Sequence, residues 1–379
     1  MQKPILALRA ELQSRFPERA HVIDGSLAAV LAGEHVLLLG PPGTAKSALV
    51  RALAQAFGGS YFERLLTKFS TPEELFGPVS LKALESDKFS RVTTGMLPTA
   101  EFAFVDEVFK ANSAILNALL SLVNERLFHN DGQPTAVPLV TMFGASNELP
   151  EGKELEALFD RFALRFQVDY LLRPQHLKSV LTSPEPKLAT ALNMKTLRAA
   201  QTEVAKVQVT DATVDALIAI RDACKAEGIV ASDRRWKKSL RLVQAASWLA
   251  GEKQTSPEEL MLLVDALWRE PKERPKVAKL VGRLADPVSL QATEVLDAAR
   301  ESADKVAALK LGDRKAYIAQ AAQALESFTQ QMQKLQKLEK SAGRRAKESI
   351  AQANAEITAI HEELARTVSS GLGLRRAGT

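Results

Sequence analysis

Short apolar runs alternate with helical patterns along the first 172 residues of this 379-residue chain. A run of four to eight apolar residues bounded by turn residues is typical of a strand that is covered on both faces. Strands that alternate with helices predict a parallel sheet with helices packed on it. The predicted strands lie at residues 36–39, 60–65, 102–105, 139–146 and 164–168.

The pattern changes to helices alone after residue 172. Residues 173–275 carry apolar side chains at spacings of three and four, which predicts an all-helical domain that ends at a polar, proline-bearing break. Residues 276–379 are also predicted to be helical. An apolar stripe over about 315–368 predicts a coiled-coil-like hairpin with a turn at 341–343, and one continuous helix is the alternative.

The residues after the first apolar run carry the clearest chemistry. They are Gly40, Pro41, Pro42, Gly43, Thr44, Ala45, Lys46 and Ser47, followed by Ala48 at the start of a helical segment. A strand, a glycine-rich turn, Lys-Ser and a helix make up the Walker A pattern, whose backbone N–H groups and helix N-terminus hold phosphates. Lys46 would contact the β- and γ-phosphates of ATP, and Ser47 would hold Mg²⁺. Ala45 stands where a glycine is usual, and we expect the loop to tolerate it.

Two carboxylates and an amide follow later apolar runs. Asp106 would orient Mg²⁺ through its water shell, and Glu107 would polarise the attacking water, as in a Walker B motif. Asn147 follows the run at 139–146, and its amide can donate and accept hydrogen bonds near the γ-phosphate. An exposed acidic pair and an Asn-containing turn are the simpler alternatives, but the Walker A pattern upstream favours the catalytic roles.

Three arginines are candidates to stabilise charge during hydrolysis. Arg161 is a candidate arginine finger that would reach the γ-phosphate of a neighbouring subunit. Arg165 is either a second finger or a salt-bridge partner. Arg234 follows Ser232, which can cap a helix, so it would lie in a first helical turn and reach the γ-phosphate from the second domain.

These motifs occur in the order typical of AAA+ ATPases. Residues 40–47, 117–125, 160–162 and 232–235 also resemble the MoxR family, and its RavA-like branch in particular. The resemblance covers residues 1 to about 270. It implies an AAA+ α/β P-loop domain with a parallel sheet at 1–172, a helical lid at 173–275 and a helical C-terminal region at 276–379. It further implies an insert at about 77–99 that forms a β-hairpin, and a second hairpin over 128–138.

The resemblance also implies roles and partners. Asn147 would be sensor 1, Arg161 the finger acting in trans and Arg234 sensor 2, while Val22 and Ile23 would supply apolar contacts to adenine. ATP with Mg²⁺ would lie between subunits of a homo-oligomeric ring, typically a hexamer. The chain would be an ATP hydrolase that remodels or matures a protein client, working with a protein that bears a von Willebrand factor A (vWA) domain.

The chain departs from the family pattern in two places. After Asp106 and Glu107 the family commonly has Asn-Arg, whereas this chain has Val108, Phe109 and Lys110. The charge of Lys110 would then replace that of the arginine. The RavA-like branch can also carry a β-rich insertion in its C-terminal region, and this sequence predicts helices there instead.

Charge leaves other functions open. Residues from 300 onward hold 14 Lys and Arg against 9 Asp and Glu, which accounts for the whole net charge of +5. This excess fits an acidic partner, nucleic acid or a membrane surface, although the interleaved signs favour a solvated helical face. A DNA-associated AAA+ motor, a metal-chelatase-type subunit and a nucleotide-stabilised scaffold are the alternatives. Nucleic acid is disfavoured because the sequence has no basic–aromatic stripe.

The C-terminal hairpin would dock a partner, assemble copies or pack within the chain.

Two further observations bear on location. No apolar run approaches the roughly 20 residues that a membrane-spanning helix needs. Cys224 is the single cysteine, so we expect neither a disulfide framework nor a Cys-based zinc site. The sequence therefore predicts a cytoplasmic protein, associated with the inner membrane only through a partner.

Overall fold

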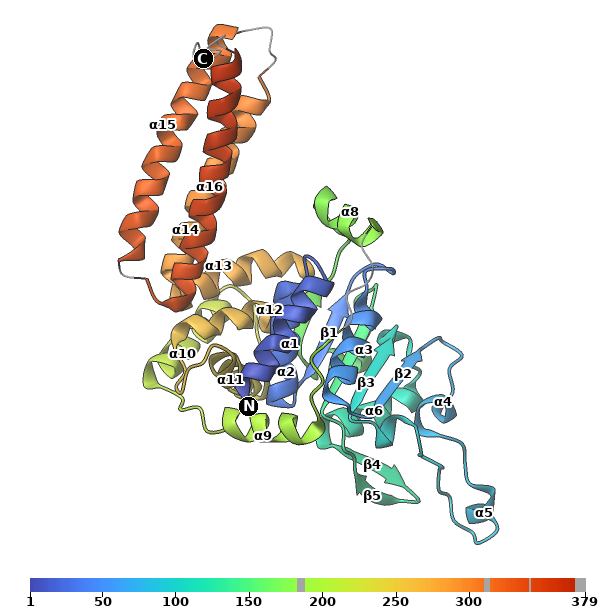
Figure 1. Ribbon diagram of the computed structural model, residues 1–379. Coiled ribbons are helices and arrows are strands. Elements are labelled where there is room, and N and C mark those ends of the chain that lie inside the picture. The colour runs from blue at the N-terminus through green and yellow to red at the C-terminus, as the bar shows by residue number, and fades with distance from the viewer. Residues whose placement is uncertain (183–187, 310–313, 341, 372–379) are drawn as a thin grey trace. The chain divides into compact units, whose positions relative to one another are not determined.

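The computed structural model describes residues 1–182, 188–309, 314–340 and 342–371. The chain divides into two compact units, Met1–Val277 and Ala278–Thr379. The first holds the sheet and the second is helical (Figure 1). None of the helices in the described ranges has the length and apolar character needed to cross a membrane.

The first unit is organised by a five-stranded parallel sheet in the order β2-β3-β6-β1-β7. Its strands are β1 (His35–Leu39), β2 (Tyr61–Leu65), β3 (Phe102–Asp106), β6 (Thr141–Ser146) and β7 (Phe162–Gln167). All but β2 are buried over nearly their whole length, as expected for parallel strands covered on both faces. The five predicted strands are confirmed, with their ends shifted by one or two residues.

Helices connect and cover these strands. They are α1 (Gln2–Arg15), α2 (Ala20–Ala32), α3 (Lys46–Phe57), α4 (Pro72–Phe76), α5 (Leu81–Leu84), α6 (Ser113–Glu125) and α7 (Lys153–Phe159), with 3-10 turns η1 (Leu97–Thr99) and η2 (Val108–Lys110). Helix α2 contacts β1 and β7, and α3 contacts β2 and β3. Helix α6 begins where the side chain of Asn112 accepts a hydrogen bond from the backbone N–H of Ile115.

The insert at 77–99 is not the β-hairpin that was predicted. Within these residues a single antiparallel bridge, Val79 to Arg91, joins the two arms, and α5 occupies the tip. Some backbone N–H groups that would pair the two arms as β-strands donate hydrogen bonds to side chains of another segment instead. The N–H of Phe89 donates to Asp131 Oδ1 at 2.8 Å, and that of Arg91 donates to Asn130 Oδ1 at 2.7 Å. The two arms are also joined by the backbone bonds of Ser80 to Ser90 and of Val92 to Pro78, both at 2.8 Å, so the insert is held by these bonds together with the neighbouring hairpin.

That neighbouring hairpin is the second one predicted, over 128–138. It consists of β4 (Leu127–Asn130) and β5 (Gln133–Ala136), which pair antiparallel. The prediction of a hairpin before the strand that leads to Asn147 is therefore confirmed.

The remainder of the first unit is helical. It comprises α8 (Pro174–Thr182), α9 (Met194–Val204), α10 (Asp211–Ala226), α11 (Asp233–Leu249), η3 (Pro257–Leu263), α12 (Val264–Leu267), η4 (Pro271–Glu273) and the start of α13 (Arg274–Ala285). Helix α11 begins at Ser232, whose side chain accepts a hydrogen bond from the N–H of Arg235. It packs along α2 and touches β7, so this helical part lies directly against the sheet domain.

Asp160 joins the helical part to the sheet. The buried guanidinium of Arg235 donates to Asp160 Oδ1 at 3.0 Å and to four main-chain carbonyl groups. Arg165 is also buried; it lies 3.9 Å from Asp160 Oδ1 and donates to the carbonyl oxygen of Trp268. Burial alone would raise the pKa of Asp160, but the two arginines lower it overall. One carboxylate is therefore shared by two buried guanidinium groups and offsets part of their charge.

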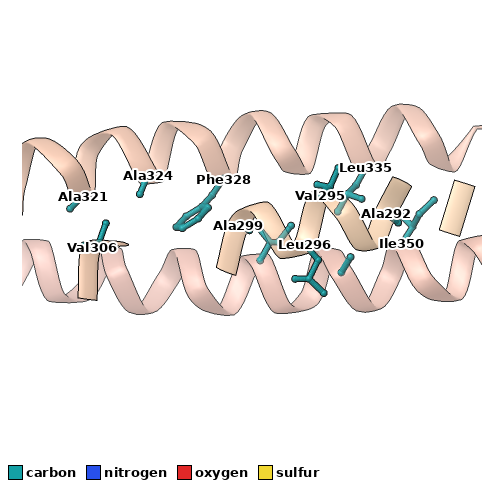
Figure 2. Packing of buried hydrophobic residues seen from close by; sticks show 12 residues of the cluster. Ala292, Val295, Leu296, Ala299, Val306, Ala321, Ala324, Phe328, Leu335 and Ile350 are labelled. Atoms are coloured by element: carbon teal, nitrogen blue, oxygen red, sulfur yellow. The ribbon is translucent and has the colours of Figure 1, made fainter. Parts of the chain in front are cut away.

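The second unit contains a bundle of three helices. Helices α14 (Pro287–Ala307), α15 (Arg314–Glu339) and α16 (Arg344–Gly371) each contact the other two. Helices α15 and α16 are the arms of the predicted hairpin, and Ser341 of the predicted turn lies outside the described residues. Phe328 is fully buried in the core, together with small and aliphatic side chains from all three helices (Figure 2). The apolar stripe therefore packs within the chain, because α14 covers it.

Replacing Asp160 by Asn should destabilise the first unit, because Arg165 and Arg235 would lose the carboxylate that they share. Removing one partner of a fully buried ion pair typically costs about 3–5 kcal/mol, and the cost here should be smaller because the Asp160 side chain is 36% exposed. We expect Asp160→Asn to lower the Tm by several degrees in thermal unfolding followed by circular dichroism. Asp222→Asn is the matched control, because the ion pair of Asp222 with Arg221 is exposed and contributes less than about 1 kcal/mol. Equal Tm values for the two variants would contradict the anchoring role.

Candidate active site

Residues 40–47 form a loop between β1 and α3, at the edge of the sheet where the strands end. The N–H of Gly40 donates to the carbonyl oxygen of Ser146 at 3.0 Å. A Cβ on Gly40 would lie 2.1 Å from the carbonyl oxygen of Val168, so only glycine fits between these strand ends. Lys46 is the first residue of α3, and its Nζ donates to the carbonyl oxygens of Gly40 and Pro41 at 2.8 and 2.7 Å.

Ala45 adopts a left-handed backbone conformation, with φ 64° and ψ 23°, immediately before α3. An L-residue in this region costs roughly 1–2 kcal/mol, which explains why glycine is usual at this position. The loop and the first turn of α3 both form with alanine in this conformation. The N-terminal N–H groups of α3 are therefore presented as a phosphate site requires.

Asp106 and Glu107 lie at the same edge, at the end of β3. Glu107 is also left-handed, with φ 52°, and its N–H donates to Asp106 Oδ1 at 3.0 Å. Its Oε2 is buried without a hydrogen-bond partner among the described residues and lies 3.9 Å from Lys110 Nζ. Burial raises the pKa of Glu107, Lys110 opposes this rise and Asp106 adds to it. A partly desolvated carboxylate with a raised pKa is suited to polarise a water molecule.

Lys110 occupies the position that was predicted for a replacement charge. It ends the short turn η2, which directly follows Glu107, and this geometry returns its ammonium group to the Glu107 side chain. A positive charge therefore stands beside the candidate base even though the Asn-Arg pair of the family pattern is missing.

The separate motifs meet because their strands are parallel neighbours. Burial lowers the pKa of Lys46, and the charges of Asp106 and Glu107 oppose that effect across the edge of the sheet. Asn147 directly follows β6 and is exposed. It lines a cavity of about 380 Å³ together with loop residues that include Gly40. Lys46, the two carboxylates and Asn147 thus share one edge.

These groups fit a triphosphate with Mg²⁺. The start of α3 and the ammonium group of Lys46 supply positive potential for phosphates. Ser47, in the first turn of α3, and Asp106 supply a hydroxyl and a carboxylate, which are the hard oxygen ligands that Mg²⁺ prefers.

A larger cavity, of about 1010 Å³, opens beside the loop. Gly43, Thr44, Ala45 and Ala48 line it, and other lining residues come from the turn between α1 and α2 and from the segment around α8. Its volume is in the range of sites for cofactors and small molecules.

Val22 and Ile23 do not line this cavity, and their contact with adenine stays a prediction. They lie in the first turn of α2, and both side chains are fully buried in the core. Phe16, Pro17 and Tyr170 supply the apolar and aromatic wall instead. Sequence reasoning missed them because Tyr170 is about 150 residues away from the other two, and no motif connects them.

Arg161 and Arg234 lie at the opposite edge of the sheet. Arg161 directly precedes β7, and Phe162 at the start of β7 is level with His35 at the start of β1. Arg234 Nη1 donates to Asn124 Oδ1 at 3.2 Å, at the end of α6. That end of α6 also lies at the start of β1, because the neighbouring carbonyl of Val123 is bonded to the His35 ring at 3.0 Å.

The two arginines are close to each other. Burial lowers the pKa of Arg161, and the charge of Arg234 lowers it further. Arg161 Nε is buried without a hydrogen-bond partner in the described part of the chain. Arg165, by contrast, is only 2% exposed and is bonded within the unit. Of the two roles considered for Arg165, the structure favours that of a salt-bridge partner, with Asp160 as its carboxylate.

Comparison with known proteins agrees with this geometry. A family model described as the MoxR domain in the MoxR-vWA-beta-propeller ternary systems matches residues 4–209, and one described as an AAA lid domain matches residues 212–281. The uncharacterized protein MJ0812 of Methanocaldococcus jannaschii is 43% identical over 304 residues, which covers 79% of this chain and 81% of that protein.

Two further similarities are more distant. Chaperone MoxR1 of Mycobacterium tuberculosis is 27% identical over 154 residues, or 39% of this chain and 40% of that protein. A crystal structure from Cytophaga hutchinsonii, described as that of an ATPase, has a TM-score of 0.62 at 18% identity. It covers 75% of this chain and 95% of that one, which shows that the two share a fold.

Replacing Ala45 by Gly should stabilise the protein by up to about 1 kcal/mol, because glycine relieves the left-handed strain while its greater unfolded-state entropy offsets part of the gain. Ala219→Gly, at an exposed position inside α10, is the matched control and should cost about 1 kcal/mol. Thermal unfolding of both variants should therefore shift in opposite directions. A loss of stability in Ala45→Gly as large as that in Ala219→Gly would show that residue 45 is not strained.

Proposed function

Because this chain belongs to the MoxR family of AAA+ ATPases, we propose that it hydrolyses ATP at interfaces between copies of itself. The observation that carries this proposal is the separation of the two halves of the site. The loop at 40–47 and Glu107 lie at the carboxyl edge of the sheet, and Arg161 and Arg234 lie at its amino edge.

The separation is too large for one subunit to use both halves. Strand β1 has five residues between these edges, and a strand of that length measures about 16 Å. Arg234 is also bonded to Asn124 on the amino edge, so it does not reach the loop of its own subunit. A head-to-tail contact would bring both arginines to the nucleotide of the next copy.

Within such an interface each residue has a defined task. The loop N–H groups and Lys46 would hold the phosphates, and Glu107 would accept the proton of the attacking water. Asn147 would orient that water through its amide. Arg161 and Arg234 of the adjacent copy would stabilise charge on the transferred phosphoryl group. Mg²⁺ bound with ATP through Ser47 and Asp106 would neutralise charge on the phosphate oxygens.

A head-to-tail interface that closes on itself forms a ring. We infer a homo-oligomeric ring, and the resemblance to the family makes a hexamer the expected size. Placement in the RavA-like branch likewise stays a prediction that rests on residues 40–47, 117–125, 160–162 and 232–235.

The described surface of the insert supports a protein client. Leu81, Leu84, Phe89 and Val92 are exposed there, by 77%, 45%, 58% and 49%. Exposed apolar groups that gather in one segment mark surfaces for protein contact. The charged residues of the insert include both signs, so this surface does not resemble a basic nucleic-acid interface. The chaperone name of the M. tuberculosis relative is consistent with a remodelling function.

Mixing two inactive variants tests whether the site is shared. Glu107→Gln and Arg161→Ala should each lower kcat by at least about 100-fold. In a random 1:1 mixture that has exchanged subunits, about a quarter of the head-to-tail interfaces would join an intact Glu107 to an intact Arg161. We therefore expect ATP hydrolysis to recover toward a quarter of the wild-type rate.

The control for this experiment is a mixture of Glu107→Gln with Lys46→Ala. Both changes damage the carboxyl-edge half of the site. Every subunit in that mixture therefore has a defective carboxyl-edge half, and activity should stay low at every interface. Equal recovery in the two mixtures, or none in either when light scattering shows co-assembly, would contradict a shared site.

We further propose a partner that carries a vWA domain. The support is the matched family model, whose description names systems that combine MoxR, vWA and beta-propeller components. A vWA-domain protein from the same organism should co-elute with the full chain in size-exclusion chromatography in the presence of ATP, and should change its rate of hydrolysis. If every such protein elutes separately and leaves the rate unchanged, the proposal fails.

A further inference from the structure

A second cavity, of about 670 Å³, lies away from the loop at 40–47 and is lined entirely by residues of the first unit. It lies where the end of α2, the end of α6 and the segment before β6 meet helices α9 and α11. None of the residues considered so far for ATP binding or hydrolysis lines it. ATP binding and hydrolysis therefore do not account for the residues that line this cavity.

Three arginines line this cavity: Arg126, Arg198 and Arg241. The described residues that line it include no Asp or Glu, and two glutamine side chains, Gln201 and Gln244, add amide groups. Like charges brought together without a carboxylate repel one another, so their gathering at one cavity indicates an anion as the missing component.

Each arginine retains capacity to donate hydrogen bonds. Arg126 Nη2 donates to the carbonyl oxygens of Gly33 and Val140, whereas its Nη1 is buried without a partner among the described residues. The two donations of Arg198, to Pro138 and Gln201, are both long at 3.3 Å. Arg241 is exposed and has no hydrogen bond or ion pair with the part of the chain that the structure describes.

The nearest candidate for a counter-charge is already engaged. Burial lowers the pKa of Arg126 to about 10; Glu34 opposes this effect and Arg198 adds to it. Glu34, however, lies 2.6 Å from Lys238 Nζ and is itself buried, so its charge is balanced by that lysine. An excess of positive charge therefore remains at the cavity.

We propose that this cavity binds a phosphorylated small molecule, with the phosphate between the three guanidinium groups. Guanidinium groups pair with phosphate through two parallel hydrogen bonds, and a phosphate dianion offsets more of this charge than a single carboxylate. The cavity is larger than a phosphate ion requires. The apolar part of the lining, its apolar wall, is made by Leu31, Val137, Leu139 and Val204. Val137 is partly exposed and would make the main contact with the organic part of the ligand, because the other three are nearly buried.

The test uses the full chain with Lys46→Ala, which weakens phosphate binding at the loop. Inorganic phosphate and phenyl phosphate are added separately, with sodium chloride at matched ionic strength as reference, and Tm is followed by thermal unfolding. Both phosphates should raise Tm in a saturable manner. Phenyl phosphate should saturate at the lower concentration because its ring would contact the apolar wall.

Substitutions in the cavity decide whether the effect arises there. Arg198→Gln and Arg241→Gln change exposed side chains, and each should weaken phosphate binding about tenfold through the loss of a charged donor. Arg221→Gln, on the exposed surface of α10, is the matched control and should leave binding unchanged.

Several outcomes would overturn the proposal. One is a rise in Tm no greater than with chloride, and another is the same rise in the Arg198→Gln and Arg241→Gln variants. Phenyl phosphate that binds no more tightly than inorganic phosphate would remove the role of the apolar wall. Loss of self-association in the cavity variants, without any effect of phosphate, would assign the cavity to an acidic side chain of a neighbouring copy.

Discussion

The parallel pairing of β1 with β6 and β7 is the constraint on which the rest of the structure depends. Because the strands run in one direction, every residue that follows a strand lies at one edge and every residue that precedes a strand lies at the other. Lys46, Glu107 and Asn147 come after strands, and Arg161 comes before one. One polypeptide therefore carries the two groups of residues at opposite edges of the sheet, which is the arrangement behind the proposed shared site.

The lid is held against the sheet by an ionic contact between the partly exposed carboxylate of Asp160 and a buried guanidinium group. Asp160 is bonded to Arg235 of α11, and this contact, with the packing of α11 along α2, holds the start of α11 at the amino edge. Arg234, the adjacent residue, is consequently on the same surface as Arg161. These two adjacent arginines therefore have different environments. Arg235 is buried and bonded to Asp160, whereas Arg234 is exposed.

Local patterns predicted the elements well where short-range chemistry decides them. Four of the five predicted runs became strands that are buried over nearly their whole length. Ser232 caps the start of α11 because its side chain accepts a backbone hydrogen bond. The same reasoning failed at 77–99, where part of the backbone of the insert is bonded to Asn130 and Asp131 of another hairpin. It also did not indicate that Val22, in the first turn of α2, has its side chain buried in the core.

The sequence by itself determined that residues 40–47 have the pattern of a phosphate-binding loop, because the spacing of loop, lysine and helix is local and carries its own chemistry. It also determined the strands and most of the helices, through apolar periodicity. Only the tertiary structure decided that Arg165 is buried while Arg161 and Arg234 share a surface, and that α14 covers the stripe of α15 and α16. These outcomes depend on contacts between residues far apart in the chain, which periodicity and spacing do not encode.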